Sequence, residues 1–309
     1  MEKIIFMGTP DFSVPILQGL IDNYNVLCVV TKEDKPVGRG NKIKYSPVKQ
    51  LALKQNIKIM QPKKIKESIE EIKSLKPDII VTCAYGQILP KELLQIPPLG
   101  CINVHASLLP SLRGGAPIHH AIMDGYDKTG ITIMYMAEGM DDGDIISQKE
   151  IKIDNIDTVE TLHDKLSILG KNLLLETLPS IISKTNKRIK QDPTKVTFGY
   201  NITKEDEKLD FNKPMIEVYN KVRGLNSWPV AYTKLDGKII KVYECYTKDR
   251  IFKNKQNGEI TNIYKDGFGV KVKDGEVIIT KVKPEGKRKM NCRDYINGMK
   301  SSIVGKILK

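Results

Sequence analysis

Short apolar runs alternate with helical patterns through residues 1–183, and this alternation restricts the possible folds more than any other feature. A strand that is followed by a helix, again and again, indicates a parallel sheet with helices on both faces. We therefore predict an α/β fold whose N-terminal domain is a Rossmann-like, mostly parallel sheet. The expected strands cover 3–8, 25–31, 57–60, 78–85, 100–105, 130–136 and 144–153, and the expected helices cover 11–23, 46–55, 66–76 and 158–183, with another from Pro117.

The pattern changes after residue 184. A polar, weakly periodic stretch comes first and is typical of a linker. A short helix at 214–224 and then several short strands broken at Asp-Gly turns follow, which predicts a small, OB-like β-barrel. The expected domains are a catalytic domain at 1–189, a linker at 190–206 and a C-terminal barrel at 207–309.

Charge and composition narrow the class of protein. The formal charge is +13, and residues 190–309 alone hold 26 Lys and Arg against 15 Asp and Glu. A basic C-terminal part is suited to bind a polyanion such as nucleic acid. Lysines spread over an ordinary protein surface would give the same excess of positive charge.

The same composition predicts a cytoplasmic protein. No apolar run approaches the ~20 residues that a membrane helix needs, and the opening "KIIFMG" is too short for a signal peptide. The five cysteines are scattered without a Cys-x-x-Cys pair, which fits a reducing compartment and argues against a bound zinc ion.

Several cofactor motifs are missing. The loop after the first strand contains Gly8 but no Gly-x-Gly-x-x-Gly, and the second strand ends at Thr31-Lys32 without an acid at that point, which argues against NAD. No phosphate-binding loop of the Gly-x-x-x-x-Gly-Lys-Ser/Thr type and no Gly-x-Ser-x-Gly turn occur. A sheet of this kind nevertheless binds its ligand at the carboxyl ends of its strands.

Asn103 and His105 lie at such an end. They are two residues apart on the expected strand, so both point to one face. The glycine pair Gly114 and Gly115 and the helix expected from Pro117 follow, and they would bring backbone N–H groups to the same space. An amide, an imidazole and backbone donors together can stabilise an oxyanion. A buried asparagine that caps a loop and a core histidine remain the alternative.

A second segment, "AEGMDDGDII", places Asp141, Asp142 and Asp144 in one glycine-rich loop. The loop is either a solvated turn, a weak calcium loop whose spacing does not match an EF-hand, or a source of one carboxylate for His105. In the last case Asp141 would keep the histidine charged and help to move a proton.

A third segment, residues 32–49, is a long basic loop that contains Gly38 and Gly40. Its lysines and one arginine outnumber its two acids, so it can contact phosphates, although a solvated surface loop has the same composition.

The chain resembles the methionyl-tRNA formyltransferases, a family of folate-dependent formyltransferases. The resemblance rests on "FMGTPDFSVP", "AYGQILP", "INVHASLLPSLRGGAPI", "GMDDGDII", "VTFGYNITKEDEKLDF" and "NSWPVAYT", in this order. It implies transfer of the formyl group of 10-formyltetrahydrofolate to the α-amino group of methionyl-initiator tRNA, without a metal, by a monomer. By motif position it implies that Asn103 and a protonated His105 stabilise the oxyanion while Asp141 relays the proton.

The resemblance also implies two binding sites. The folate is expected at Tyr85, Gly86, Gln87, Ile88, Leu89, Pro90, Ser107, Leu108, Leu109, Pro110, Asp142 and Asp144. The tRNA is expected at Lys35, Arg39, Lys42 and Lys44 of the basic loop, where Arg39 occupies the place of the family's key arginine, and at Lys287, Arg288 and Lys289 of the barrel.

Two departures from the family pattern and three alternatives accompany this prediction. Ser111 and Leu112 stand where the family usually has basic and aromatic residues, and Asp142 stands where it often has threonine. The alternatives are a formyltransferase for a small amine (an amino sugar nucleotide or glycinamide ribonucleotide), a formyl-folate hydrolase, and a tRNA-binding protein without catalysis.

Overall fold

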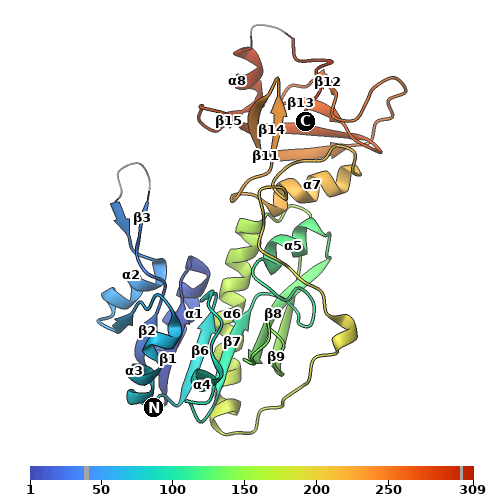
Figure 1. Cartoon of the computed structure of the whole chain (residues 1–309). Helices are drawn as coiled ribbons and strands as arrows, with labels where there is room; N and C mark the ends of the chain where they lie inside the picture. Colours follow the sequence, from blue (N-terminus) through green and yellow to red (C-terminus); the bar gives the residue numbers. More distant parts are fainter. Residues whose placement is uncertain (38–41, 300–301) are drawn as a thin grey trace. The chain divides into compact units, whose positions relative to one another are not determined.

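The computed structural model describes residues 1–37, 42–299 and 302–309 (Figure 1). By their contacts these residues divide into two compact units that interleave along the chain. The first unit contains Met1–Pro117, Lys128–Lys152 and His163–Tyr200, and the second contains Ile118–Asp127, Ile153–Leu162 and Asn201–Lys309. Each unit is described separately below, and the expected domain boundaries at residues 189 and 207 remain a prediction.

The first unit is built on a seven-stranded sheet with the order β5-β2-β1-β6-β7-β8-β9. The strands from β5 to β7 are parallel, whereas β8 runs antiparallel to both β7 and β9. The prediction of a mostly parallel sheet is thereby confirmed. The strands are β1 (Lys3–Gly8), β2 (Asn25–Val30), β5 (Lys58–Met60), β6 (Ile79–Cys83), β7 (Cys101–His105), β8 (Lys128–Tyr135) and β9 (Ile145–Lys152).

Helices cover both faces of this sheet, because its strands are apolar on both sides. On one face α1 (Val14–Asn23) packs beside the part of α6 (Val159–Ile182) that belongs to this unit, where the Ser167 hydroxyl donates to the Phe12 carbonyl. Gly170 permits a close approach there, since a Cβ would lie 3.1 Å from Val104 of β7. On the other face Ile72 of α3 (Ile69–Ser74) and Leu93 of α4 (Lys91–Leu94) join the core formed with β1, β2 and β6.

The elements expected from sequence recur within a few residues, and the structure adds others. The basic loop at 32–49 contains a two-stranded ribbon, β3 (Lys35–Val37) and β4 (Lys42–Lys44), which projects from the sheet in Figure 1. Ser46 caps α2 (Pro47–Lys54) directly after it by accepting from the Lys49 N–H. The remaining short elements are η1 (Asp11–Ser13), η2 (Ile65–Ser68), α5 (Pro117–Met123) and η3 (Pro193–Lys195).

The expected linker is partly attached to the first unit. Ile189 exchanges backbone hydrogen bonds with Ile145, and Thr197 and Gly199 exchange them with the loop around Arg113. The stretch up to Tyr200 therefore packs as part of the first unit rather than acting as a free spacer.

The second unit is an antiparallel sheet with the order β10-β11-β14-β13-β12, to which β15 adds beside β14. Its core includes Phe268, Val242 and Ile260, which are fully buried, and Val218 and Val222 of α7. Short strands at the predicted Asp-Gly turns thus build a curled antiparallel sheet, in agreement with the expected barrel architecture. The elements are α7 (Met215–Gly224), β10 (Tyr232–Leu235), β11 (Lys238–Lys248), β12 (Ile260–Ile263), β13 (Phe268–Lys271), β14 (Glu276–Pro284), β15 (Met290–Asn291) and α8 (Cys292–Asn297).

Within the described residues, none of the helices has the length and apolarity that crossing a membrane requires.

The cysteines lead to a first prediction. All five are free thiols, and burial raises the pKa of Cys28, Cys83, Cys101 and Cys245 to about 12 and that of Cys292 as well. Because the thiolate is the reactive form, about one thiol in ten thousand is ionised at pH 8 when the pKa is 12. Ellman's reagent should therefore react slowly with the native protein and with five thiols after unfolding in urea. A rapid phase of one equivalent or more in the native protein would contradict this.

Candidate active site

The carboxyl end of β7 brings the two expected polar side chains to one face of the sheet. Alternation along the strand places Asn103 and His105 on the same side as Cys101, which belongs to the core beneath α3 and α4, and opposite to Val104, which faces α6. His105 is buried, with 6% of its surface exposed, whereas Asn103 is half-buried. Asn103 thus lies nearer the surface of the site, and the histidine ring lies deeper.

Thr82 fixes the orientation of the Asn103 amide. Its hydroxyl lies 2.8 Å from Asn103 Oδ1, on the neighbouring strand β6 and in register with it. The hydroxyl donates to this oxygen, so the two N–H bonds of Asn103 Nδ2 remain for other acceptors. An amide held in this way is a preorganised hydrogen-bond donor.

His105 has one nitrogen committed to the protein and one facing a carboxylate. Its Nε2 lies 3.1 Å from the carbonyl of Leu112, and since a carbonyl only accepts, Nε2 carries a hydrogen. Its Nδ1 lies 3.7 Å from Asp141 Oδ2. A proton that the ring gains must therefore bind at Nδ1, on the side of the carboxylate.

The Asp141 carboxylate is held by a backbone hydrogen bond, and the Asp141 backbone has an unusual conformation. Its Oδ2 accepts a hydrogen bond of 2.8 Å from the backbone N–H of Gly114. Its own backbone is left-handed, with φ of 48°, which is an unfavourable conformation for a residue other than glycine. The glycine pair was expected to allow a close backbone approach and the helix from Pro117 to aim N–H groups at this space; the structure shows that the Gly114 N–H binds the Asp141 carboxylate.

The other two acids of the loop have different surroundings. A Cβ on Gly139 would lie 2.1 Å from Asp142 Oδ2, so this side chain folds over the glycine. Asp144 accepts from Arg188 Nε at 3.0 Å. Among the described residues, no group of three or more His, Cys, Asp and Glu side chains could hold a metal ion.

Of the two segments expected to bind folate, residues 84–90 have the features that such a ligand needs. Among the described residues, the backbone of 85–89 makes no hydrogen bond to other backbone groups. Ile88 is 80% exposed, and the buried Tyr85 hydroxyl has no partner in the part of the chain that the structure describes. Gln87 differs from its expected role, because its Oε1 accepts from the Ile65 N–H at 2.9 Å and so braces the loop.

The second segment, Ser107–Pro110, is hydrogen-bonded mostly within the protein. The Ser107 hydroxyl donates to Ser111 O, and the N–H of Leu109 donates to the Thr132 hydroxyl. Ser107 and Leu109 are buried, whereas Leu108 and Pro110 are half-buried. Only the latter two therefore present surface to a ligand.

The residues expected to bind tRNA fall into three groups. Lys35 and Lys44 are exposed and directly opposite each other on β3 and β4. Lys42 lies on β4, and Arg39 lies outside the described residues. The three basic residues in the turn between β14 and β15 of the second unit are exposed, and they are Lys287, Arg288 and Lys289.

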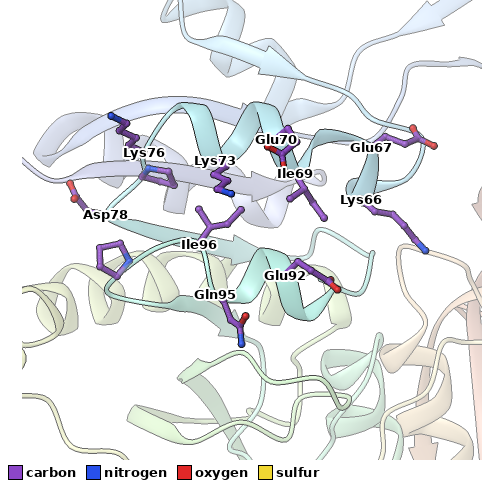
Figure 2. A pocket seen from close by; sticks show the side chains of 12 residues that line it. Lys66, Glu67, Ile69, Glu70, Lys73, Lys76, Asp78, Glu92, Gln95 and Ile96 are labelled. Atoms are coloured by element: carbon purple, nitrogen blue, oxygen red, sulfur yellow. The ribbon is translucent and has the colours of Figure 1, made fainter.

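A hollow of about 850 Å³ in the first unit lies away from these side chains. It is lined by α3, by α4 and by Asp78 at the amino end of β6, and Ile69, Lys73 and Ile96 point into it (Figure 2). No residue that was predicted to be catalytic or to bind a ligand lines it.

Sequence reasoning missed two residues of the site. Thr82 sits inside an apolar strand, where a threonine is unremarkable, and Gln191 sits in the polar stretch interpreted as a linker. Gln191 hydrogen-bonds both the acidic loop and Arg113. No spacing or composition signal marks either residue, because the partner of Thr82 is 21 positions away in the sequence and those of Gln191 are 48 to 78 positions away.

Comparison with known proteins agrees with the family resemblance. A family model described as formyl transferase matches residues 2–178, and its C-terminal domain model matches 201–300. Methionyl-tRNA formyltransferases from Bacillus thuringiensis subsp. konkukian (strain 97-27) and Bacillus cereus (strain ZK / E33L) are 50% identical over 99% of this chain and 99% of their own.

Solved structures share the fold at lower identity. An N-formyltransferase from Helicobacter canadensis, in complex with folinic acid and dTDP-3-aminofucose, has a TM-score of 0.70 and 21% identity over 94% of this chain and all of its own. HypX from Aquifex aeolicus, in complex with tetrahydrofolic acid, has a TM-score of 0.66 and 16% identity over 96% of this chain. This chain spans 47% of that HypX chain.

The backbone at Gly114 leads to a second prediction. Its φ is 115°, and a Cβ there would lie 2.9 Å from the carbonyl oxygen of Gly199. Gly114→Ala should therefore lower the free energy of unfolding of this unit by about 1–3 kcal/mol, measured by urea denaturation followed by circular dichroism. Ser111→Ala in the same loop, where φ is not positive, is the matched control and should change it by less than about 0.5 kcal/mol. Equal effects of the two substitutions would refute the backbone argument.

Proposed function

Because this chain belongs to the formyl transferase family, we propose that it transfers a formyl group from 10-formyltetrahydrofolate to the α-amino group of methionyl-initiator tRNA. The full-length identity of 50% to methionyl-tRNA formyltransferases is the observation that carries this proposal. The arrangement of Asn103, His105 and Asp141 at the carboxyl end of β7 supports it, since it offers a fixed donor and a proton relay in one place.

The residues beside the site fit the formyl donor. The pterin ring of a folate needs hydrogen bonds along its edges and apolar contact on its faces. The backbone of 85–89 supplies free donors and acceptors, and Ile88 and Leu108 supply apolar surface. When bound, the folate supplies a formyl carbon that is open to attack by an amine.

The protein has to supply a hydrogen bond rather than a nucleophile. An aminoacyl amine is a weak base and is partly neutral near pH 7, so it can attack the formyl carbon itself. As the C–N bond forms, negative charge develops on the formyl oxygen. Asn103 donates to that oxygen through Nδ2, while the Thr82 hydroxyl hydrogen-bonds Oδ1 at the other end of the amide.

Asp141 and His105 handle the proton. The attacking nitrogen becomes positively charged, and the Asp141 carboxylate stabilises it and accepts its proton. His105 Nδ1 faces the same carboxylate and can take the proton in turn, because Nε2 already holds its hydrogen against Leu112. The bond between the formyl carbon and N10 of the folate then breaks, the relay gives the proton to N10, and tetrahydrofolate leaves while the formyl group stays on the amine. We place His105 in this relay rather than at the oxyanion, where the sequence suggested it, since both its nitrogens face protein groups.

The β3–β4 ribbon provides a surface for the tRNA. Two lysines directly opposite each other on neighbouring strands repel when no anion is present. A phosphate group between Lys35 and Lys44 removes that repulsion, so the ribbon is suited to the backbone of a nucleic acid.

The decisive experiment is a formyl-transfer assay with matched initiator and elongator methionyl-tRNAs at two salt concentrations. We expect formylation of the initiator tRNA that weakens steeply as salt rises. Transfer to an amino sugar nucleotide or glycinamide ribonucleotide alone, or formate release that ignores added tRNA, would instead identify one of the alternative activities.

Asn103 gives a third prediction. Loss of one donor to a developing oxyanion costs a factor of about 10² to 10³ in turnover, so Asn103→Ala should lower kcat at least that far. Thr82→Val removes the hydroxyl that orients the amide and should lower kcat by a smaller factor. Near-normal turnover of Asn103→Ala would remove this residue from the mechanism.

The ribbon gives a fourth prediction. Lys35→Ala combined with Lys44→Ala should raise KM for tRNA and reduce the dependence of log Kd on log salt by about 2, or about 1 for each phosphate contact. The matched control is Lys54→Ala with Lys73→Ala, which removes the same charge from exposed positions on α2 and α3. Equal salt dependence in the two double variants would exclude a specific contact by the ribbon.

A further inference from the structure

One side chain of the stretch predicted as a linker connects two loops of the candidate site. Gln191 donates from Nε2 to the carbonyl of Asp141 at 2.7 Å and to the carbonyl of Gly143 at 2.8 Å. Its Oε1 accepts from Arg113, at 3.1 Å from Nε and at 2.8 Å from Nη2. A single amide thus joins the loop that carries the carboxylate to the loop that carries the Gly114 donor.

These hydrogen bonds allow only one orientation of the amide. Both N–H bonds of Nε2 are used on carbonyl oxygens, which only accept, and Oε1 is used on a guanidinium, which only donates. If the amide turned over, oxygen would face oxygen on one side and N–H would face N–H on the other. Because only one orientation of the amide satisfies these hydrogen bonds, the contact fixes where the acidic loop lies.

The backbone beside Gln191 is itself fixed. Ile189 exchanges two backbone hydrogen bonds with Ile145, at 2.8 and 2.9 Å, and Arg188 pairs with Asp144. On the far side the Thr197 hydroxyl accepts a hydrogen bond from the Leu112 N–H, and the Thr197 carbonyl accepts one from the Arg113 N–H.

Asp141 needs such support. Its left-handed backbone costs about 1–3 kcal/mol and persists only where surrounding contacts impose it. The Gln191 hydrogen bond to the Asp141 carbonyl is one such contact, and it acts on the residue whose carboxylate lies 3.7 Å from His105 Nδ1.

We propose that Gln191 is a positioning residue of the transfer reaction: it clamps the backbone at Asp141 and Gly143 and thereby sets the carboxylate against His105 Nδ1 and the Gly114 N–H. The role rests on the function proposed above. Gln191 acts through Asp141, so its loss should affect turnover more than substrate binding.

The first experiment separates positioning from binding. Misplacing a reacting group by about 1 Å can cost a factor of about 10², so Gln191→Ala should lower kcat by about 10- to 100-fold while KM for tRNA and for the folate changes less than about threefold. Gln95→Ala, an exposed glutamine on the first unit, is the control and should retain wild-type kcat. A change confined to KM, or no change in kcat, would overturn the proposal.

A conservative substitution separates the two halves of the clamp. Gln191→Glu keeps the side-chain length and the acceptors for Arg113, but it has no N–H for the Asp141 and Gly143 carbonyls. If the clamp on the acidic loop matters, this variant is as slow as Gln191→Ala. If Gln191 only anchors Arg113, the glutamate variant is as fast as the wild type, and the proposal fails.

A double-mutant cycle tests whether Gln191 acts through Asp141. In an Asp141→Asn background, Gln191→Ala should cause little further loss of kcat, since the group that it positions is already changed. An undiminished loss in that background would mean that Gln191 supports the fold in general, and the proposal would be wrong.

Hydrogen exchange tests the clamp without reference to activity. In Gln191→Ala, backbone amides of residues 138–145 and of Gly114 should exchange faster than in the wild type, while Gln95→Ala should leave them unchanged. Unchanged exchange in Gln191→Ala would refute the clamp whatever the enzyme does. If exchange is faster in Gln191→Ala but the wild-type protein fails to formylate methionyl-tRNA in the assay, the proposed function is refuted and the clamp stands.

Discussion

The approach of Asp141 to His105 is the interaction on which the candidate site depends. It requires three segments that are far apart in the sequence, namely β7, the acidic loop and the stretch that leaves α6. Each is held by hydrogen bonds to another: Leu112 fixes the imidazole, Gly114 binds the carboxylate, and Gln191 binds the backbone behind it. Because buried polar groups of this kind are nearly all paired, the arrangement is rigid, and rigidity is what a preorganised site needs.

The sheet explains why this site lies where it does. Parallel strands direct their carboxyl ends to one edge, where the loops that follow them meet. In this protein α6 covers one face of β7, and loops rather than a helix cover the other face at its end, where Asn103 and His105 point. The two side chains that face these loops are ones to which the proposed mechanism assigns the reaction.

The residues proposed to contact the tRNA differ in exposure from the residues proposed to take part in the reaction. The side chains proposed to be catalytic are buried or half-buried and paired with the protein, whereas Lys35, Lys44 and the basic turn at 287–289 are exposed. Lys49 belongs to the basic loop by sequence but is paired with Asp34 and Gln61 at the base of the ribbon, so it holds the ribbon rather than offering a free charge. Basic composition alone does not distinguish these two uses of a lysine.

Much of the fold follows from the sequence because its causes are local. Apolar periodicity predicts the strands and helices, Asp-Gly turns predict the hairpins of the second unit, and the spacing of Asn103 and His105 predicts that they share a face. The ribbon inside the basic loop was not predicted, since its three-residue strands carry lysines rather than an apolar pattern.

The sequence by itself determined which residue types reach the end of β7 and that the motifs of the formyl transferase family follow one another from residue 4 to past residue 233. Only the tertiary structure decided that Asp141 meets His105 on its Nδ1 side, that the Gly114 N–H serves the carboxylate, and that Gln191 joins the two loops. The physical reason is that these polar contacts join segments 27 to 78 residues apart, and their geometry follows from how the loops pack rather than from any local preference of the chain.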